Sequence, residues 1–157
     1  MVDGRRWRAT DPSIPDALRV ELVRELMAAR RAVRTAGDDA AAERAARARV
    51  KDAKVALGER GEPWWEAPSD EGRRLRVGAT LRTLLRSRDP GTVCPSDVAR
   101  VIGGASWRST MNLVRDAGAE LADAGELEVR QRGERVPDPH DTRGPVRYAA
   151  PPGRPVP

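Results

Sequence analysis

Apolar residues recur at spacings of three and four from Leu18 to Val33, which places them on one stripe of a helix. Ser13 supplies a capping hydroxyl in front of this stripe, and Pro15 suits the first helical turn. Gly37 then ends the pattern. The pattern predicts a first helix that turns one apolar face towards a core.

A second helical stripe begins directly after this glycine. Asp38 and Asp39 place negative charge where a helix start favours it, and small apolar residues then recur up to Leu57. Two helices joined by so short a turn must lie antiparallel, so we predict a helical hairpin. Because its second helix offers mostly alanine for burial, the hairpin needs further packing partners.

Two adjacent tryptophans, Trp64 and Trp65, follow the hairpin in a segment that contains proline. Adjacent side chains cannot both point into one helix face, so at least one of them is expected to be exposed, which would suit a partner surface or a dimer. The proline-containing stretch 62–69 is the natural boundary. We therefore predict an N-terminal helical hairpin with a tryptophan-rich end over residues 1–66 and a second domain over residues 70–149.

The second domain begins with a helical pattern over 71–86, in which Leu75 is one apolar position, and a short strand pattern over 92–94. Ser96 then opens a short helix that the glycine pair 103–104 ends, and Ser106 is predicted to cap a longer helix.

This short helix, glycine turn and longer helix fit a helix-turn-helix. Such a motif needs a small residue where its helices cross and a glycine at positive φ in its turn, and Ala99 and Gly103 suit those two positions. Trp107 starts the apolar stripe of the longer helix, so we expect it to belong to the core.

Strand patterns follow the helix-turn-helix. Alternating residues from Leu127, with a turn at Gly133, predict a β-hairpin, and residues 145–149 predict one more short strand. The predicted fold class is therefore mainly α with a small β-wing: a winged helix-turn-helix domain preceded by an antiparallel helical hairpin. The proline-rich tail over 150–157 is predicted to be disordered.

Four motifs resemble one known family in order: "CPSDVARVIGG", "WRSTMNLVR", "GELEVRQRG" and "RGPVRY". Together they resemble the bacterial winged-helix family designated domain of unknown function 3253, over about half of the chain. The segments "DGRRWRATDPSIP" and "ALGERGEPWWE" are similar to the N-terminal part of high-GC bacterial proteins sometimes labelled biopolymer transporter Tol. The resemblance implies a fold and no established activity.

The net positive charge of the chain indicates a candidate class of partner. The 157 residues include 29 basic and 24 acidic side chains, with a net charge of +5, and all the basic ones except Lys51 and Lys54 are arginine. This surplus suits a polyanion, although it is spread over both halves of the chain and forms no basic arm. No signal-peptide pattern or long apolar run occurs, so we expect a soluble, cytoplasmic protein.

The polar face of the longer helix is predicted to enter the major groove of duplex DNA. Arginine can read guanine, asparagine can read adenine, and arginines on the wing can contact phosphate. The predicted nucleic-acid contacts are Arg108, Ser109, Asn112 and Arg115 on the helix, and Arg130, Arg132 and Arg135 on the wing. The alternative is a solvated polar face on a scaffold, in which Trp64 and Trp65 bind a protein partner or form a homodimer.

Catalysis and metal binding have little support in the sequence. Cys94 is the single cysteine and His140 the single histidine, so an intrachain disulfide is impossible and a Cys–His pair would have to meet across the fold. Asp138 and Asp141 flank the histidine, which also describes ordinary turn chemistry. We predict no catalytic residue, no metal ligand and no cofactor, and we do not expect an enzyme.

Overall fold

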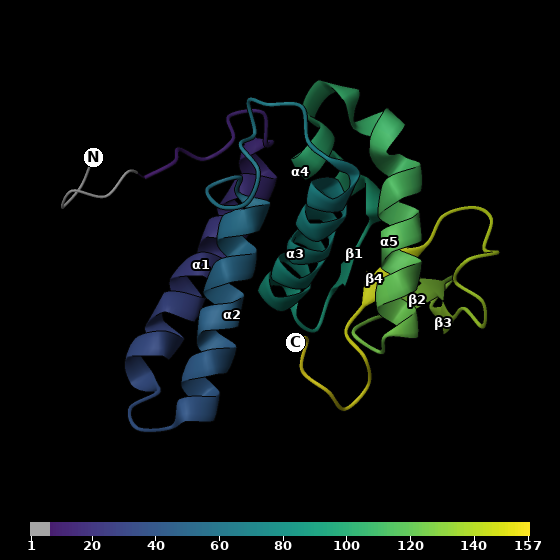
Figure 1. Cartoon of the computed structure of the whole chain (residues 1–157). Helices are drawn as coiled ribbons and strands as arrows, with labels where there is room; N and C mark the ends of the chain where they lie inside the picture. Colours follow the sequence, from purple (N-terminus) through teal and green to yellow (C-terminus); the bar gives the residue numbers. More distant parts are fainter. Residues whose placement is uncertain (1–6) are drawn as a thin grey trace.

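The computed structural model of this chain describes residues 7–157 (Figure 1). Residues 1–6, where the predicted N-terminal unit and one resemblance motif begin, lie outside the described part. The elements in chain order are α1 (Asp16–Thr35), α2 (Ala40–Ala56), α3 (Asp70–Arg88), β1 (Thr92–Val93), α4 (Pro95–Gly103), the 3₁₀ helix η1 (Gly104–Thr110), α5 (Met111–Asp123), β2 (Glu128–Gln131), β3 (Glu134–Arg135) and β4 (Arg147–Ala149). The predicted fold class, mainly helical with a small β-wing after the helices, is confirmed.

α1 and α2 form the predicted antiparallel hairpin (Figure 1). Asp39 is the N-cap of α2, and its carboxylate accepts hydrogen bonds from two backbone N–H groups of the first turn. The predicted cap of α1 is wrong, because Pro15 occupies the N-cap position without a side-chain hydrogen bond. Ser13 instead donates its hydroxyl proton to the carboxylate of Asp11 at 2.7 Å.

One continuous apolar core joins the hairpin to the rest of the chain. Leu22 of α1 and Leu57 at the end of α2 are fully buried, as are Leu81 and Leu84 of α3, and all four belong to the same cluster of packed side chains. The core therefore continues across the predicted boundary at 62–69.

α3 is the central helix of the molecule. It packs against α1, α2, α4 and α5, which explains why almost every side chain from 77 to 85 is buried. The buried hydroxyls of Thr80 and Thr83 donate to backbone carbonyls one turn earlier, so burial leaves neither group without a partner. Leu75, predicted as an apolar position, is 62% exposed and faces a groove beside the start of α3.

The strands form one antiparallel sheet in the order β1-β4-β2-β3. The β2–β3 hairpin closes through Arg132 and Gly133, whose φ angles of 53° and 86° suit a tight two-residue turn. Tyr148 of β4 is buried beneath α5, where a Cβ at Gly118 would lie 2.5 Å from the tyrosine ring. A residue without a side chain at this position lets α5 approach the sheet closely.

The turn after α4 corrects one prediction. Gly104, and not Gly103, takes the positive φ of 51°. Gly103 has a different function, since a Cβ there would lie 3.0 Å from the side chain of Thr110. The predicted crossing residue, Ala99, is buried, and its carbonyl accepts a hydrogen bond from Thr110 at 3.4 Å.

The longer helix also begins later than predicted. Ser106 has non-helical backbone angles and does not cap α5, because residues 104–110 form η1 and α5 starts at Met111. Arg108 and Ser109 therefore lie on a 3₁₀ helix, which winds more tightly than an α-helix.

The C-terminal residues 150–157, predicted to be disordered, have contacts in the structure. Val156 is half-buried against the main core, and Pro157 lines a groove beside α3. This segment thus carries the chain from β4 back towards its helical half (Figure 1).

Candidate nucleic-acid interface

The junction of η1 and α5 exposes three of the predicted contact residues: Arg108, Ser109 and Asn112. The guanidinium of Arg108 lies 4.5 Å from the ring centroid of Trp107, and that of Arg100, on α4, lies 4.6 Å from it. Stacking fixes the plane of a guanidinium while its N–H donors remain available at the edge. The half-buried Trp107, which packs on the core, therefore orients two cations at the surface.

Arg115 uses its donors inside the molecule. Its guanidinium donates to the carbonyl oxygens of Thr142 at 2.6 Å and Gly144 at 3.0 Å. These bonds hold the loop between β3 and β4 beside α5, so Arg115 anchors the wing to the helix.

His140 ties the same loop to the other end of α5. Its Nε2 atom lies 2.7 Å from a carboxylate oxygen of Asp123, and this hydrogen bond raises the pKa of His140 above its ordinary value of 6.5. Cys94 has a different neighbour, the hydroxyl of Ser96 at 3.1 Å, and no hydrogen bond joins the cysteine to His140. Nor do any three His, Cys, Asp or Glu side chains in residues 7–157 cluster closely enough to hold a metal ion.

The wing keeps its unpaired cations at its tip. Arg132 and Arg135 are exposed and form no ion pair with any residue from 7 to 157. Arg130 is half-buried and donates to Glu128 at 3.1 Å, so much of its charge is neutralised. Of the three predicted wing arginines, the two at the tip are available to an external anion.

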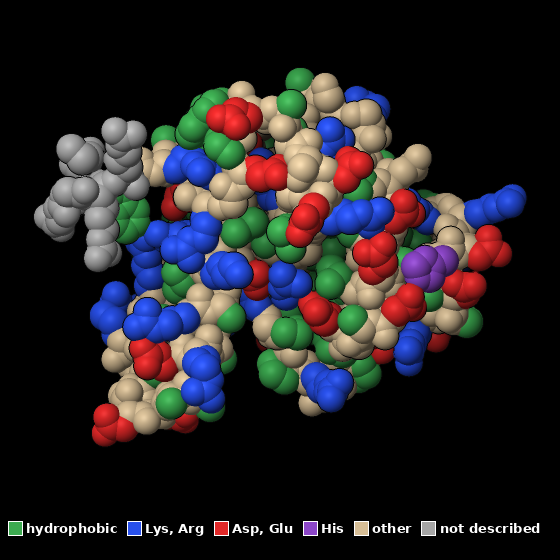
Figure 2. Space-filling model, viewed as in Figure 1, with side chains coloured by type: hydrophobic (Ala, Val, Ile, Leu, Met, Phe, Trp, Pro, Cys, Tyr) green, Lys and Arg blue, Asp and Glu red, His purple; other side chains and the backbone are tan. Residues whose placement is uncertain are grey.

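The remaining exposed face of α5 is acidic. Asp116, Glu120 and Asp123 lie along it, and Figure 2 shows acidic side chains gathered around the single histidine. A polyanion would be repelled from this face, because the three carboxylates are exposed and, within residues 7–157, only Glu120 pairs with an arginine, Arg74, at 2.8 Å. Exposed arginines that an anion could contact lie instead at the start of α5 and at the tip of the wing.

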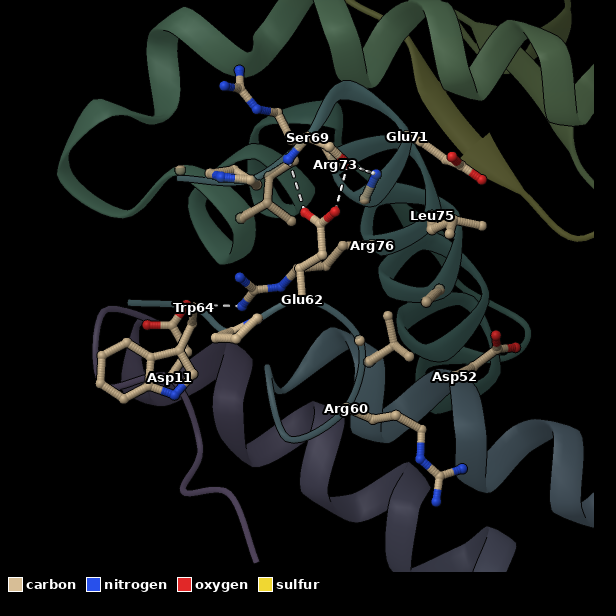
Figure 3. A pocket seen from close by; sticks show the side chains of 18 of the residues that line it. Asp11, Asp52, Arg60, Glu62, Trp64, Ser69, Glu71, Arg73, Leu75 and Arg76 are labelled. Carbon is tan, nitrogen blue, oxygen red and sulfur yellow. Dashed lines mark hydrogen bonds and ion pairs between the residues drawn. The ribbon is translucent and has the colours of Figure 1, made fainter. Parts of the chain in front are cut away.

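A separate groove of about 1080 Å³ lies between the end of α2, the start of α3 and the turn after α4 (Figure 3). Trp64 and the exposed Leu75 give it apolar surface. Glu62 lies within it and accepts hydrogen bonds from the hydroxyl of Ser69 at 2.5 Å and its backbone N–H at 2.8 Å, which lower the pKa of Glu62. The groove thus combines apolar walls with an ordered carboxylate.

The two tryptophans beside this groove differ in exposure. Trp64 is half-buried and donates its indole N–H to the carbonyl of Ala9 at 3.1 Å. Trp65 is 59% exposed and meets the ring of Trp64 edge-to-face at 5.1 Å. Trp64 therefore holds the segment around Ala9 in place, and Trp65 is the more exposed of the two tryptophans.

Sequence reasoning missed the arginines of α3 and assigned no role to them. They bind carboxylates from other elements: Arg76 pairs with Asp11 at 2.9 Å, Arg82 with Asp52 and Glu126 at 3.0 Å each, Arg86 with Asp52 at 2.9 Å, and Arg88 with Glu21 at 2.6 Å and Asp97 at 2.7 Å. The signal that could have indicated these ion pairs is the combination of several arginines with a mostly apolar stretch in the same helix. These pairs remove much of the positive charge that a polyanion could have used.

Fold and site together define a mainly helical protein with a small antiparallel sheet and arginines exposed at the start of α5 and at the wing tip. Residues 74–151, from within α3 to just beyond the last strand, match the model of the family described as "Protein of unknown function (DUF3253)". The curated proteins contain no match to the chain. Within residues 7–157, no helix is both long and apolar enough to cross a membrane.

Proposed function

We propose that residues 70–149 form a winged helix that binds duplex DNA through the η1–α5 junction and the wing tip. The observation that carries the proposal is the set of three exposed polar side chains at the junction, Arg108, Ser109 and Asn112, with Arg108 stacked on Trp107. The order of one helix, a strand, two further helices and a β-hairpin supports the winged-helix assignment. The proposal includes no enzymatic step.

The exposed arginines and Asn112 divide between reading bases and contacting the phosphate backbone in this binding mode. Arg108 donates to a guanine edge and Asn112 makes the paired hydrogen bonds that recognise adenine. Arg132 and Arg135 contact backbone phosphates from the wing. Arg115, although predicted as a contact, holds the wing loop against α5 and acts on DNA only by positioning that loop.

The test is a selection of bound duplexes from a random DNA library near physiological salt, where general attraction to a basic protein is suppressed. We expect one enriched motif, and we expect R108A and N112A to abolish its enrichment. The double variant R132A/R135A should weaken binding to all sequences and reduce the salt slope by about one unit for each phosphate that the wing no longer binds.

The matched control for the wing variant is R31A/R44A. It removes the same charge from exposed positions on α1 and α2, so general electrostatic attraction falls equally in both variants. Absence of any enriched motif with a folded protein, or a motif that survives R108A and N112A, would overturn the proposal.

A second candidate function is self-association through the tryptophan-rich end, because Trp65 and Leu75 are both more than half exposed. Sedimentation of the wild-type chain should then reveal a concentration-dependent dimer that W65A abolishes. Trp7 is 55% exposed and gives the control W7A, which should leave the dimer intact. A wild-type chain that stays monomeric would exclude this candidate.

A further inference from the structure

A second groove, of about 540 Å³, lies on the helical hairpin, outside the region that matches the family model. We call it the hairpin groove. Its lining residues are Arg30, Val33 and Arg34 from α1, Arg47, Ala48, Val50 and Lys51 from α2, and Arg60. Every charged residue of this lining is cationic.

The two helices bring these cations together by their periodicity. Arg30 and Arg34 are one helical turn apart on α1, and Arg47 and Lys51 are one turn apart on α2. Like charges at this spacing repel each other and destabilise the helix that carries them. Two such pairs around one concave surface are costly in the free protein, and an anion between them would relieve the repulsion.

Within residues 7–157, the carboxylates of the hairpin pair with one of the five cations of the groove, Arg47, and with none of the other four. Asp52 binds arginines of α3, and the buried Glu25 binds Arg49 at 2.7 Å. Glu43 reaches only Arg47, at 2.7 Å.

The other four cations, Arg30, Arg34, Lys51 and Arg60, form no ion pair with any residue from 7 to 157. Basic side chains accordingly gather over the hairpin in Figure 2.

The cations of the hairpin groove also affect a neighbouring side chain, Lys54. Lys54 lies on α2, and its ammonium sits 4.4 Å from the ring centroid of Trp7. Burial lowers the pKa of Lys54, repulsion from Arg30 and Arg60 lowers it further, and attraction to Glu59 offsets only part of this effect. Two of the groove's own cations thus act on one nearby group.

We propose that the hairpin groove binds a compact ligand with adjacent phosphate groups, of the polyphosphate type. Four unpaired cations from two helices and the following turn converge there, which suits several neighbouring anionic oxygens better than one carboxylate. Val33 and Val50 contribute apolar surface that offers no competing acceptor. The site is independent of the proposed DNA interface, which uses η1, α5 and the wing.

The test is calorimetric titration of the whole chain with inorganic tripolyphosphate near physiological salt. R34A/K51A removes one unpaired cation from each helix, and we expect it to weaken binding about tenfold or more. The matched control is again R31A/R44A, which removes the same charge from the same helices at exposed positions outside the lining. We expect this control to bind within about twofold of wild type.

Several outcomes would overturn the inference. Undetectable binding to a folded wild-type chain would do so, and so would an equal weakening in the two double variants, which would indicate general attraction. Tighter binding of a single-stranded oligonucleotide that competes at the hairpin groove would replace the compact ligand by a nucleic-acid backbone. R34A/K51A should still enrich the wild-type DNA motif, so failure of this site and failure of the proposed function are distinguishable.

Discussion

At the scale of single residues, Gly118 decides how closely α5 can approach the sheet. It lies within the helix and is buried, and a Cβ there would lie 2.5 Å from the ring of Tyr148. The same tyrosine donates its hydroxyl proton to the carbonyl of Val114, one turn earlier, at 3.3 Å. The side chain of Tyr148 thus fixes the position of α5 relative to β4.

We predict that G118A lowers the free energy of unfolding by about 1–3 kcal/mol, because the methyl group forces Tyr148 out of its site. This destabilisation opposes the gain of roughly 1 kcal/mol that alanine brings to a helix. The control is G78A in α3, whose Cβ would meet the guanidinium of Arg82 at 3.4 Å, an ordinary contact distance, and it should be neutral or stabilising. Urea unfolding of both variants measures the difference, and equal effects would contradict the packing explanation.

At the scale of elements, α3 is held to the hairpin by ion pairs as well as by apolar contact. Asp52 of α2 accepts hydrogen bonds from Arg82 at 3.0 and 3.1 Å and from Arg86 at 2.9 Å. Arg86 is the more deeply buried of the two, and two of its nitrogens find no acceptor within residues 7–157. Burial accordingly lowers the pKa of Arg86, so this arginine stabilises the charged pair less than its position suggests.

We therefore expect R82A to destabilise the protein and R86M not to. R86M removes the donors that lack acceptors while Asp52 keeps both bonds from Arg82, so stability should be unchanged or rise by about 1 kcal/mol. R82A deprives both Asp52 and Glu126 of a partner and should cost about 2 kcal/mol. Chemical denaturation distinguishes the two variants. An R86M chain destabilised as much as R82A would show that Arg86 is the principal partner.

At the scale of the whole molecule, the apolar core extends from the hairpin into the unit that matches the family model. Leu22 and Leu26 of α1 share one cluster with Leu81 and Leu85 of α3. The cluster continues to Tyr148 of the last strand. A division into residues 1–66 and 70–149 therefore cuts through packed side chains.

From this continuity we predict that a fragment of residues 70–157 does not unfold cooperatively and binds an apolar dye, because α3 loses the surface that buries one of its sides. The whole chain should unfold in a single transition seen both by tryptophan fluorescence and by circular dichroism. A fragment with its own sharp transition would instead support two independent domains.

The features that the sequence determined by itself are those that depend on residues close together along the chain. Apolar periodicity placed α1, α2 and α3, the aspartate at position 39 marked the start of α2, and Gly133 marked the turn of the wing, because each of these depends on neighbours within a turn or two. The predicted start of α5 was wrong because the 3₁₀ helix η1 precedes it. The turn at Gly104 lies against Ser13, which is distant along the chain, and local periodicity does not report such a contact.

Only the tertiary structure decided which charges are free. Arg115 and Arg108 have the same chemistry and lie about two helical turns apart, yet Arg115 binds the wing loop and Arg108 stacks on Trp107 at the surface. Arg82 and Lys51 likewise read alike along the chain, although the first is paired with Asp52 and the second lines the hairpin groove. Periodicity reports neighbours along one helix, whereas an ion pair requires residues from distant parts of the chain to meet, so the availability of each cation depends on packing.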